Sequence, residues 1–224
     1  MKIAELFYSI QGEGSLVGVP SVFIRTSGCN LRCAWCDTPY TSWQPEGTEL
    51  ELDRILHEVA ALPARHVVVT GGEPMIAPDI LALTGRLRAL GKHITIETAG
   101  TVFAPVACDL MSISPKLANS TPDDPRWSGR HERLRIQPAV LAELMARYEY
   151  QLKFVIQRAD DLDEVRSLVE RLSADRERVI LMPEGTDGDR LRERGVWLAE
   201  VCKEEGFRFS PRLQVDLWGN RRGT

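Results

Sequence analysis

The sequence predicts an α/β protein in which parallel strands form an incomplete, TIM-like barrel with helices outside. Two observations predict it: short β-type runs alternate with amphipathic helical patterns, and several runs are apolar at consecutive positions. Strands covered on both faces have this continuous apolar pattern, and strand–helix alternation implies parallel strands with right-handed crossovers. Six such runs in 224 residues are too few for a closed eight-stranded barrel, which takes about 250 residues. An open sheet of about six parallel strands therefore fits best.

The expected elements follow from the spacing of the apolar residues. The six β-type runs are residues 22–25, 66–70, 93–97, 110–114, 151–156 and 178–182. Apolar side chains recur at helical spacing within four segments, which predicts a helix in each of 52–59, 80–90, 165–172 and 189–205. By contrast, the connection at 100–109 is too short for a long crossover helix, and the polar, proline-rich segment 117–137 is typical of a loop or lid.

The two ends of the chain lie outside this alternation. A β-type run at residues 5–10 leads into Gln-Gly-Glu-Gly, which predicts a hairpin or a tight turn. No repeat, low-complexity tract or linker-like stretch divides the chain. We therefore expect one domain over residues 1–224, with an N-terminal strand and loop at 1–21, a core at 22–206 and a tail at 207–224.

The composition excludes several classes of protein. Hydrophobic residues make up 43% of the chain and charged residues 27%, which is enough apolar material for a sizeable core. The net charge of −4 argues against a broad nucleic-acid-binding face and against attraction to anionic membranes. No apolar run approaches the roughly 18 residues of a membrane span, and the first residues lack the apolar region of a signal peptide. We therefore expect a cytoplasmic protein without nucleic-acid or membrane partners.

Three of the five cysteines, Cys29, Cys33 and Cys36, lie close together just after the first parallel run. An odd number of cysteines in a reducing compartment argues against a disulfide framework. Structural zinc usually takes four ligands, and no fourth cysteine or histidine lies nearby. A [4Fe–4S] cluster held by only three thiolates would leave one iron free to bind a ligand. The spacing favours the cluster over zinc, and we expect Cys108 and Cys202 to be small buried hydrophobes.

A second motif stands at the end of the next run, where Thr70 leads into Gly-Gly-Glu-Pro. On its own, this tetrapeptide indicates a tight turn that enters a helix. Together with Cys-x3-Cys-x2-Cys, in which the aromatic Trp35 precedes the last cysteine, it resembles the radical S-adenosylmethionine superfamily. The resemblance implies a truncated radical S-adenosylmethionine core, with a [4Fe–4S] cluster and S-adenosylmethionine as cofactors.

This resemblance implies the cofactor-binding residues by position. The free iron is expected to hold the amino and carboxylate groups of S-adenosylmethionine, whose ammonium would meet the backbone of Gly71 and Gly72 or the Glu73 carboxylate. Further contacts to S-adenosylmethionine are expected from Trp35, Cys36, Asp37, Glu97, Ser114, Pro115 and Lys116. No side chain is expected to be catalytic, because the cofactor carries the radical chemistry.

A longer resemblance narrows the family. The string LFYSIQGEGSLVGVPSVFIRTSGCNLRCAWCDTPY and the later strings ETAGT, SPK, QLKFVI and RLQVDLWGNRRG are similar to the 7-carboxy-7-deazaguanine synthases of queuosine and 7-deazapurine biosynthesis. The similarity implies a lyase that converts 6-carboxy-5,6,7,8-tetrahydropterin to 7-carboxy-7-deazaguanine by C6 hydrogen abstraction, ring contraction and loss of ammonia. It also implies Mg2+ held partly by the Thr38 hydroxyl, a homodimer, and a flavodoxin- or ferredoxin-type reductant.

Substrate-binding residues follow from the same similarity. Ile10, Gln11, Gly12 and Glu13 are expected at the pterin edge, where a carboxylate can accept the N–H pair of an aminopyrimidinone. Arg25 stands in the centre of an apolar run, and a guanidinium is costly to bury there without an anion. The substrate carboxylate is one candidate partner for it, and a structural ion pair is the alternative.

Of three further polar residues, only Thr70 belongs to the expected site. Thr70 is expected to add a hydroxyl toward the substrate. Lys153 lies within an apolar run, either in contact with a ligand or in a buried ion pair. Gln214 stands where related chains usually carry histidine, and an amide cannot titrate near neutral pH, so we expect no acid–base role for it.

Two other functions share part of these features. A glycyl-radical-enzyme activase would need the cysteine motif and Gly-Gly-Glu-Pro but neither Gln-Gly-Glu-Gly nor a carboxylate-binding Arg25. A non-catalytic iron–sulfur or zinc-binding module would account for the cysteines alone. Neither alternative explains the polar residues at the ends of several strands.

Overall fold

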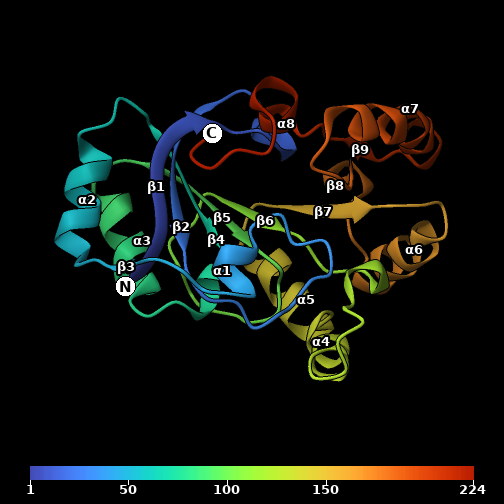
Figure 1. Cartoon of the computed structure of the whole chain (residues 1–224), viewed down its shortest axis with the longest axis horizontal. Coiled ribbons are helices and arrows are strands. Elements are labelled where there is room, and N and C mark those ends of the chain that lie inside the picture. The colour runs from blue at the N-terminus through green and yellow to red at the C-terminus, as the bar shows by residue number, and fades with distance from the viewer.

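The computed structural model describes every residue of the chain, 1–224, and has an open nine-stranded sheet at its centre (Figure 1). The strands lie in the order β3-β1-β2-β4-β5-β6-β7-β8-β9. The parallel centre consists of β2 (Pro20–Thr26), β4 (His66–Gly71), β5 (His93–Thr98), β6 (Leu110–Ile113), β7 (Tyr150–Ile156) and β8 (Val179–Pro183). Each predicted run coincides with one of these strands, so the predicted open sheet of parallel strands is confirmed.

The edges of the sheet contain further strands. β1 (Lys2–Ile10) runs antiparallel to β2 and forms the predicted hairpin with it. The loop between them contains the single turn η1 (Gly14–Leu16). β3 (Thr48–Glu49) extends this edge, and β9 (Arg208–Phe209) extends the opposite edge. The sequence did not predict β3 and β9, because two-residue strands are too short to show a period.

All four predicted helices are present. They are α2 (Leu52–Ala60), α3 (Ile80–Ala89), α6 (Asp161–Leu172) and α7 (Gly188–Glu205). No helix connects β5 to β6, as the short connection predicted. The crossover from β6 to β7 contains α5 (Pro138–Arg147), which the sequence pattern did not predict and which begins with a proline at its first position. Shorter elements are α1 (Pro39–Ser42), η2 (Pro74–Ile76), η4 (Arg176–Arg178) and α8 (Leu213–Trp218).

The core accounts for the consecutive apolar residues in the strands. Val67, Val68 and Val69 of β4 are all buried, so both faces of this strand are covered. β2 ends in Thr26 and β5 in Thr98, and Ser114 directly follows the last residue of β6. Polar residues therefore begin at or just beyond the ends of these three strands, on the side of the sheet where the cavity lies.

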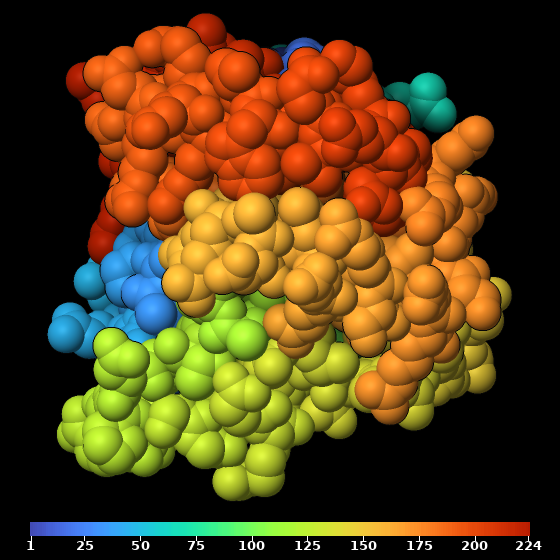
Figure 2. All heavy atoms as spheres, turned by 90° about the vertical axis from the view of Figure 1, so that its right-hand side faces the viewer, coloured from blue at the N-terminus to red at the C-terminus, as the bar shows by residue number.

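The segment 117–137 differs from the prediction of a loop or lid. It contains the turn η3 (Ala118–Ser120) and the helix α4 (Ser128–Leu134). A helix of seven residues with four charged or histidine side chains has no clear apolar stripe, which explains why the sequence pattern did not show it. Figure 2 shows this part of the chain, in green, on the same face as α6 and α7. No helix in the structure is both long enough and apolar enough to cross a membrane.

Candidate active site

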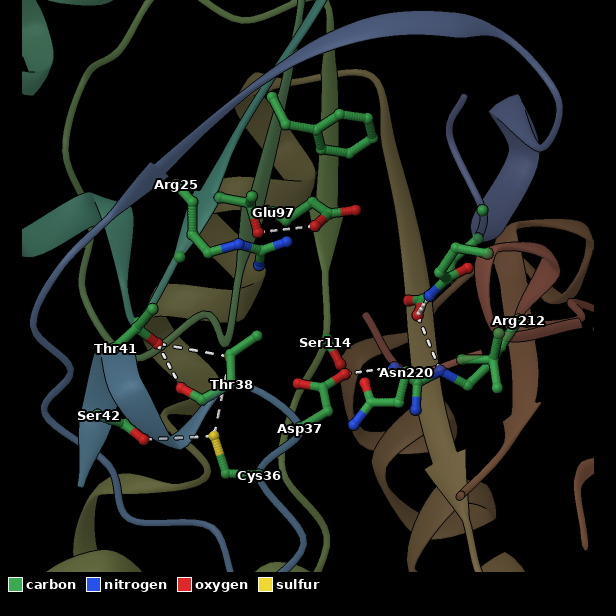
Figure 3. A pocket seen from close by; sticks show the side chains of 18 of the residues that line it. Arg25, Cys36, Asp37, Thr38, Thr41, Ser42, Glu97, Ser114, Arg212 and Asn220 are labelled. Atoms are coloured by element: carbon green, nitrogen blue, oxygen red, sulfur yellow. Dashed lines mark hydrogen bonds and ion pairs between the residues drawn. The ribbon is translucent and has the colours of Figure 1, made fainter. Parts of the chain in front are cut away.

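A cavity of about 460 Å³ lies at the carboxyl ends of the parallel strands, the edge where such sheets hold ligands. Of the predicted site residues, only Glu73 and Pro115 are absent from its lining. Those that line it are Ile10, Gln11, Gly12, Glu13, Arg25, Cys29, Cys33, Trp35, Cys36, Asp37, Thr38, Thr70, Gly71, Gly72, Glu97, Ser114 and Lys116. Figure 3 shows Cys36 and Thr38, Arg25 and Glu97, and Arg212 around one common space.

The loop that carries the three cysteines is compact. The Cys36 amide donates to the Cys33 carbonyl at 3.3 Å, and the Leu31 amide donates to the Cys29 sulfur at 3.4 Å. The Cys36 sulfur lies 3.3 Å from the Ser42 hydroxyl at the end of α1. Short-range contacts therefore bring the three thiols to one wall of the cavity.

The segment 117–137 holds this loop from outside the cavity and contributes no residue to the lining. Nδ1 of the buried His131 accepts the Arg32 amide at 3.2 Å, and its Nε2 lies 2.9 Å from the Ser120 hydroxyl. The Ser120 carbonyl accepts the Ala34 amide at 2.8 Å. Since Ser120 Oγ donates to a carbonyl of its own turn, Nε2 of His131 must donate to Ser120, and because Nδ1 accepts the Arg32 amide the ring is neutral. The segment is thus a scaffold for the cysteine loop and does not cover the cavity as a lid would.

The thiols fit an iron–sulfur cluster better than a single metal ion. Burial raises the pKa of Cys29 to about 11 and that of Cys33 to about 12, so both stay protonated at neutral pH until a metal centre displaces the protons. No three cysteine, histidine or carboxylate side chains converge closely enough to hold one metal ion. Three thiols are one ligand short of a usual structural zinc site, whereas a cluster bound by three thiolates keeps one iron free for a further ligand.

The two glycines after β4 are required by close backbone contacts. Gly71 has φ of +133°, and a Cβ atom there would lie 2.2 Å from the Thr26 carbonyl oxygen. A Cβ atom on Gly72 would lie 2.0 Å from the Gly28 carbonyl oxygen, directly before the first cysteine. Glycine at both positions therefore lets the end of β4 pack against the cysteine loop while its backbone also lines the cavity.

Glu73 is placed differently from the expectation that its carboxylate meets the ammonium of S-adenosylmethionine. It is 1% exposed and lies outside the cavity lining. Its carboxylate accepts the Thr98 hydroxyl at 2.7 Å and the amides of Met75 and Ala99 at 3.1 and 2.9 Å. Burial raises its pKa. The carboxylate is already satisfied by protein donors, so Glu73 connects the ends of β4 and β5, and the backbone of Gly71 and Gly72 remains for a ligand.

Lys116 and Ser114 form a polar pair beyond β6. Lys116 Nζ donates to the Ser114 hydroxyl at 2.8 Å and to the Ser114 carbonyl at 2.9 Å, and it lies 5.8 Å from the centre of the Trp35 ring. These side chains line the cavity next to the cysteine loop, whereas Pro115 between them does not. The pair therefore offers a cation and a hydroxyl on the cysteine side of the cavity.

A buried charge network occupies the other side. One carboxylate oxygen of Glu13 accepts a hydrogen bond from Lys153 at 2.5 Å. The other oxygen accepts hydrogen bonds from Arg212 at 3.1 Å and from Gln214 at 2.9 Å. Lys153 therefore takes the ion-pair alternative. Burial alone would raise the pKa of Glu13, but Lys153 and Arg212 hold it well below its usual range. Arg212 also pairs with Asp37 of the cysteine loop.

Arg25 has a protein partner and still faces the cavity. Its Nε lies 2.7 Å from Glu5 Oε2 without a hydrogen bond aimed at that oxygen, and Tyr40 Oη donates to the same oxygen at 2.6 Å. The guanidinium also lies 5.7 Å from the centre of the Phe7 ring. Glu5 balances the charge, and the two terminal nitrogens of Arg25 remain without a protein acceptor at the cavity wall.

Glu97 lies with the residues predicted to bind substrate. One oxygen accepts the Thr70 hydroxyl at 2.8 Å, and the other accepts the Gln11 side-chain amide at 3.1 Å. The expectation had grouped Glu97 with the cofactor contacts. The structure therefore gives Glu97 two neighbours from the substrate side.

Sequence reasoning gave no role to several other cavity residues, among them Glu5 and Tyr40, Phe7 and Phe23, Arg212, and the tail from Gly219 to Thr224. Phe7 and Phe23 stack with ring centres 4.9 Å apart, as opposite residues of the β1–β2 hairpin. The predicted hairpin places these two aromatic residues opposite each other, and Arg212 with residues 219–223 lies within the string RLQVDLWGNRRG that carries the resemblance.

Comparisons with known proteins agree with this geometry. The Radical SAM superfamily matches residues 23–120, which span the cysteine loop and the ends of β4, β5 and β6. A 7-carboxy-7-deazaguanine synthase from Rhodopirellula baltica is 47% identical over 226 residues, covering 99% of this chain and 88% of that protein. One from Halobacterium salinarum is 47% identical over 238 residues, covering 100% of this chain and 93% of that protein.

This chain belongs to the 7-carboxy-7-deazaguanine synthase family. The crystal structure of QueE from Escherichia coli agrees, with a TM-score of 0.70 and 29% identity over 95% of this chain and 93% of that one. As a 7-carboxy-7-deazaguanine synthase family member, the chain is a radical S-adenosylmethionine enzyme, which implies a [4Fe–4S] cluster and S-adenosylmethionine as cofactors. Family membership decides against the activase and the non-catalytic metal module.

Proposed function

We propose that this enzyme converts 6-carboxy-5,6,7,8-tetrahydropterin to 7-carboxy-7-deazaguanine with loss of ammonia. One observation carries the proposal: a single cavity is lined by three cysteine thiols, by the ionised Glu13 and by the free guanidinium nitrogens of Arg25. A carboxylate is a suitable acceptor for the N–H groups of a pterin, and a guanidinium is a suitable donor for the substrate carboxylate. The names of the relatives support this substrate class.

In this proposal Cys29, Cys33 and Cys36 hold the cluster. When bound, the cluster and S-adenosylmethionine supply the 5′-deoxyadenosyl radical that removes a hydrogen atom from C6 of the substrate. The backbone of Gly71 and Gly72 binds the ammonium of S-adenosylmethionine, and Ser114 and Lys116 meet its carboxylate and ribose. Trp35, Asp37 and Thr98 enclose it from the neighbouring walls of the cavity.

The chain's residues bind and orient the substrate. Glu13 stays ionised beside Lys153 and Arg212, so it accepts a pterin N–H group without taking a proton. Arg25 holds the substrate carboxylate. Glu97 keeps Gln11 and Thr70 at fixed positions beside the ring. The protein thus positions C6 and excludes water, while no side chain needs to move a proton at C6.

Magnesium is the third proposed cofactor. Thr38 lines the cavity directly after Asp37, and its hydroxyl lies 3.4 Å from the Thr41 hydroxyl and 3.9 Å from the Cys36 sulfur. A single protein hydroxyl suits Mg2+, which keeps most of its water ligands and takes others from a substrate carboxylate. Asp37 is already paired with Arg212 and adds negative charge nearby.

The remaining proposals concern partners and compartment. The exposed apolar side chains of Leu217 and Trp218 in α8 support a homodimer contact at this helix. Ala34 in the cysteine loop is exposed, which supports electron entry from a flavodoxin- or ferredoxin-type reductant at this face. The five free cysteines support a reducing cytoplasm.

Turnover by the anaerobically reconstituted protein tests the proposal. The protein is supplied with S-adenosylmethionine, Mg2+, dithionite and the carboxypterin, and products are separated by chromatography and mass. We expect 7-carboxy-7-deazaguanine and ammonia in equal amounts. Release of 5′-deoxyadenosine without the deazaguanine would reject the substrate assignment while retaining the radical chemistry.

A further inference from the structure

Arg212 connects three segments that are far apart in the sequence. It is 8% exposed, and each arm of its guanidinium has an acceptor. Nε donates to Glu13 at 3.1 Å, Nη1 to the Gly185 carbonyl at 2.5 Å, and Nη2 to Asp37. Figure 3 shows the contact between Arg212, which comes from the tail, and Asp37, which comes from the cysteine loop.

The backbone around Arg212 is fixed as well. Arg212 is the residue directly before α8, and the amide of Leu213 donates to the Gly12 carbonyl at 3.0 Å. A Cβ atom on Gly12 would lie 1.7 Å from the Gln214 side-chain oxygen, so the start of α8 rests directly on the Gln-Gly-Glu-Gly loop. Arg212 is therefore held both by the backbone next to it and by the contacts of its guanidinium group.

The contacts of Glu13 limit how it can bind a ligand. A carboxylate has about four acceptor positions, and Lys153, Arg212 and Gln214 already occupy three of them. Roughly one position thus remains for an N–H group from the cavity. Arg212 helps to determine which position that is, because a planar guanidinium fixes direction as well as charge.

We propose that Arg212 is a positioning residue that sets the free acceptor of Glu13 relative to Asp37 and the cysteine loop. The proposal rests on the proposed function, in which Glu13 binds the pterin and the cysteine loop holds the cluster. Arg212 itself has no contact with substrate in this scheme. Because it contacts both Glu13 and Asp37, it fixes the substrate-binding side of the cavity relative to the cysteine loop. The reacting carbon of the substrate therefore stays at the right distance from the source of the radical.

A purely structural ion pair would stabilise the fold without affecting that register. The test therefore combines Arg212→Met and Arg212→Lys with readouts other than stability. Binding of 7-carboxy-7-deazaguanine, which carries the same aminopyrimidinone edge, is measured by calorimetry without turnover. The amount of 5′-deoxyadenosine formed per deazaguanine is measured in the reconstituted enzyme, together with iron content.

We expect Arg212→Met to bind the product roughly tenfold to a hundredfold more weakly, as for a buried charge that loses its partner. We expect excess 5′-deoxyadenosine, because the radical forms while C6 is misplaced, and unchanged iron content. Arg212→Lys keeps the positive charge but loses the planar guanidinium that contacts several acceptors at once. Compared with Arg212→Met, it should therefore bind the product more tightly but still form excess 5′-deoxyadenosine per deazaguanine. Arg166→Met is the matched control, since Arg166 also joins two carboxylates, Asp163 and Glu205, away from the cavity.

A second variant keeps the proposal testable if Arg212→Met does not fold. Asp37→Asn leaves Arg212 on Glu13 and weakens its link to the cysteine loop. We expect product affinity to be retained and the 5′-deoxyadenosine ratio to rise. Lower thermal stability with unchanged affinity and ratio in the Arg212 variants, or an unchanged ratio in Asp37→Asn, would overturn the proposal. Wild-type protein that forms no deazaguanine and does not bind it would instead reject the proposed function.

Discussion

The two sides of the cavity are held by different forces. On the cysteine side, the loop is held largely by neutral groups, namely the His131 ring, the Ser42 hydroxyl and backbone amides, with Lys116 as a neighbouring cation. On the opposite side, Glu13 pairs with Lys153 and Arg212 within one buried network. We infer that the cysteine side is suited to bind a charged metal centre. On the opposite side, the charge of Glu13 is already compensated by Lys153 and Arg212 in the absence of a ligand.

This difference predicts which substitutions act on which side. Changes on the cysteine side should affect the assembly of the cluster or the stability of its loop. Changes on the charged side should affect substrate while the cluster still assembles.

Cys36→Ala should abolish both the brown chromophore and turnover, because two thiolates cannot hold the cluster. Iron content and the visible spectrum after anaerobic reconstitution measure the first effect, and deazaguanine formation measures the second. Cys108→Ala is the matched control, since Cys108 is also free and its thiol only contacts the Ile94 carbonyl at 3.7 Å. Zinc in place of iron in the wild-type protein would contradict the cluster assignment.

Arg25→Ala should weaken substrate binding by roughly two to four decades, about 3–5 kcal/mol, and leave the cluster intact. Removing Arg25 also leaves the Glu5 carboxylate with only the Tyr40 hydroxyl, which would further repel an anionic substrate. Steady-state kinetics against substrate concentration measure the effect, with Arg54→Ala on the exposed face of α2 as the control. Unchanged KM and kcat would show that Arg25 serves only its ion pair.

His131 makes the cysteine loop sensitive to acid. Burial lowers its pKa from the ordinary 6.5 to about 4, so the unfolded chain binds the proton more readily than the folded one. The contribution of His131 to the free energy of unfolding should therefore be fully present above pH 6.5. It should decrease as the pH drops toward 4, with a loss of about 2 kcal/mol at pH 5. Thermal or denaturant unfolding at pH 7.5 and pH 5 measures this. His131→Gln should be less stable at pH 7.5 and lose less on acidification, and an equal loss in both proteins would contradict the neutral-ring assignment.

Thr38→Ala should have the smallest effect. Removing one of several oxygen ligands should raise the Mg2+ concentration needed for half-maximal turnover by roughly tenfold, with cluster content unchanged. Titration of turnover with Mg2+ at saturating substrate measures it. Thr41→Ser, which keeps the hydroxyl that lies 3.4 Å from Thr38, is the control. Identical titrations for Thr38→Ala and wild type would remove Thr38 from the metal site.

The sequence predicted the parts of the molecule that have a local signal. Consecutive apolar residues predicted the parallel strands, and the spacing of Cys29, Cys33 and Cys36 predicted one wall of the cavity. Glu73 shows the limit of such a motif, because its neighbour in space is Thr98 on the next strand and the motif alone could not show that its carboxylate was already occupied.

Other features depend on contacts between distant segments. Arg212 and Glu13 are 199 positions apart, and Arg25 meets Glu5 only because β1 and β2 pair in one particular register. The role of the segment 117–137 depends likewise on His131 reaching Arg32, 99 positions earlier. No period or spacing in a single sequence reports such pairs. These contacts can be identified only from the folded structure.

The division of the cavity can be tested by measuring iron content and deazaguanine binding on the same two variants. Cys36→Ala should lose its iron and bind 7-carboxy-7-deazaguanine within about threefold of wild type, because the side-chain partners of Glu13 and Arg25 do not include Cys36. Glu13→Gln should keep its iron and bind the product roughly a hundredfold more weakly. If each variant lost both properties together, or if Glu13→Gln bound the product normally, the account of a metal-binding side and a substrate-binding side would be contradicted.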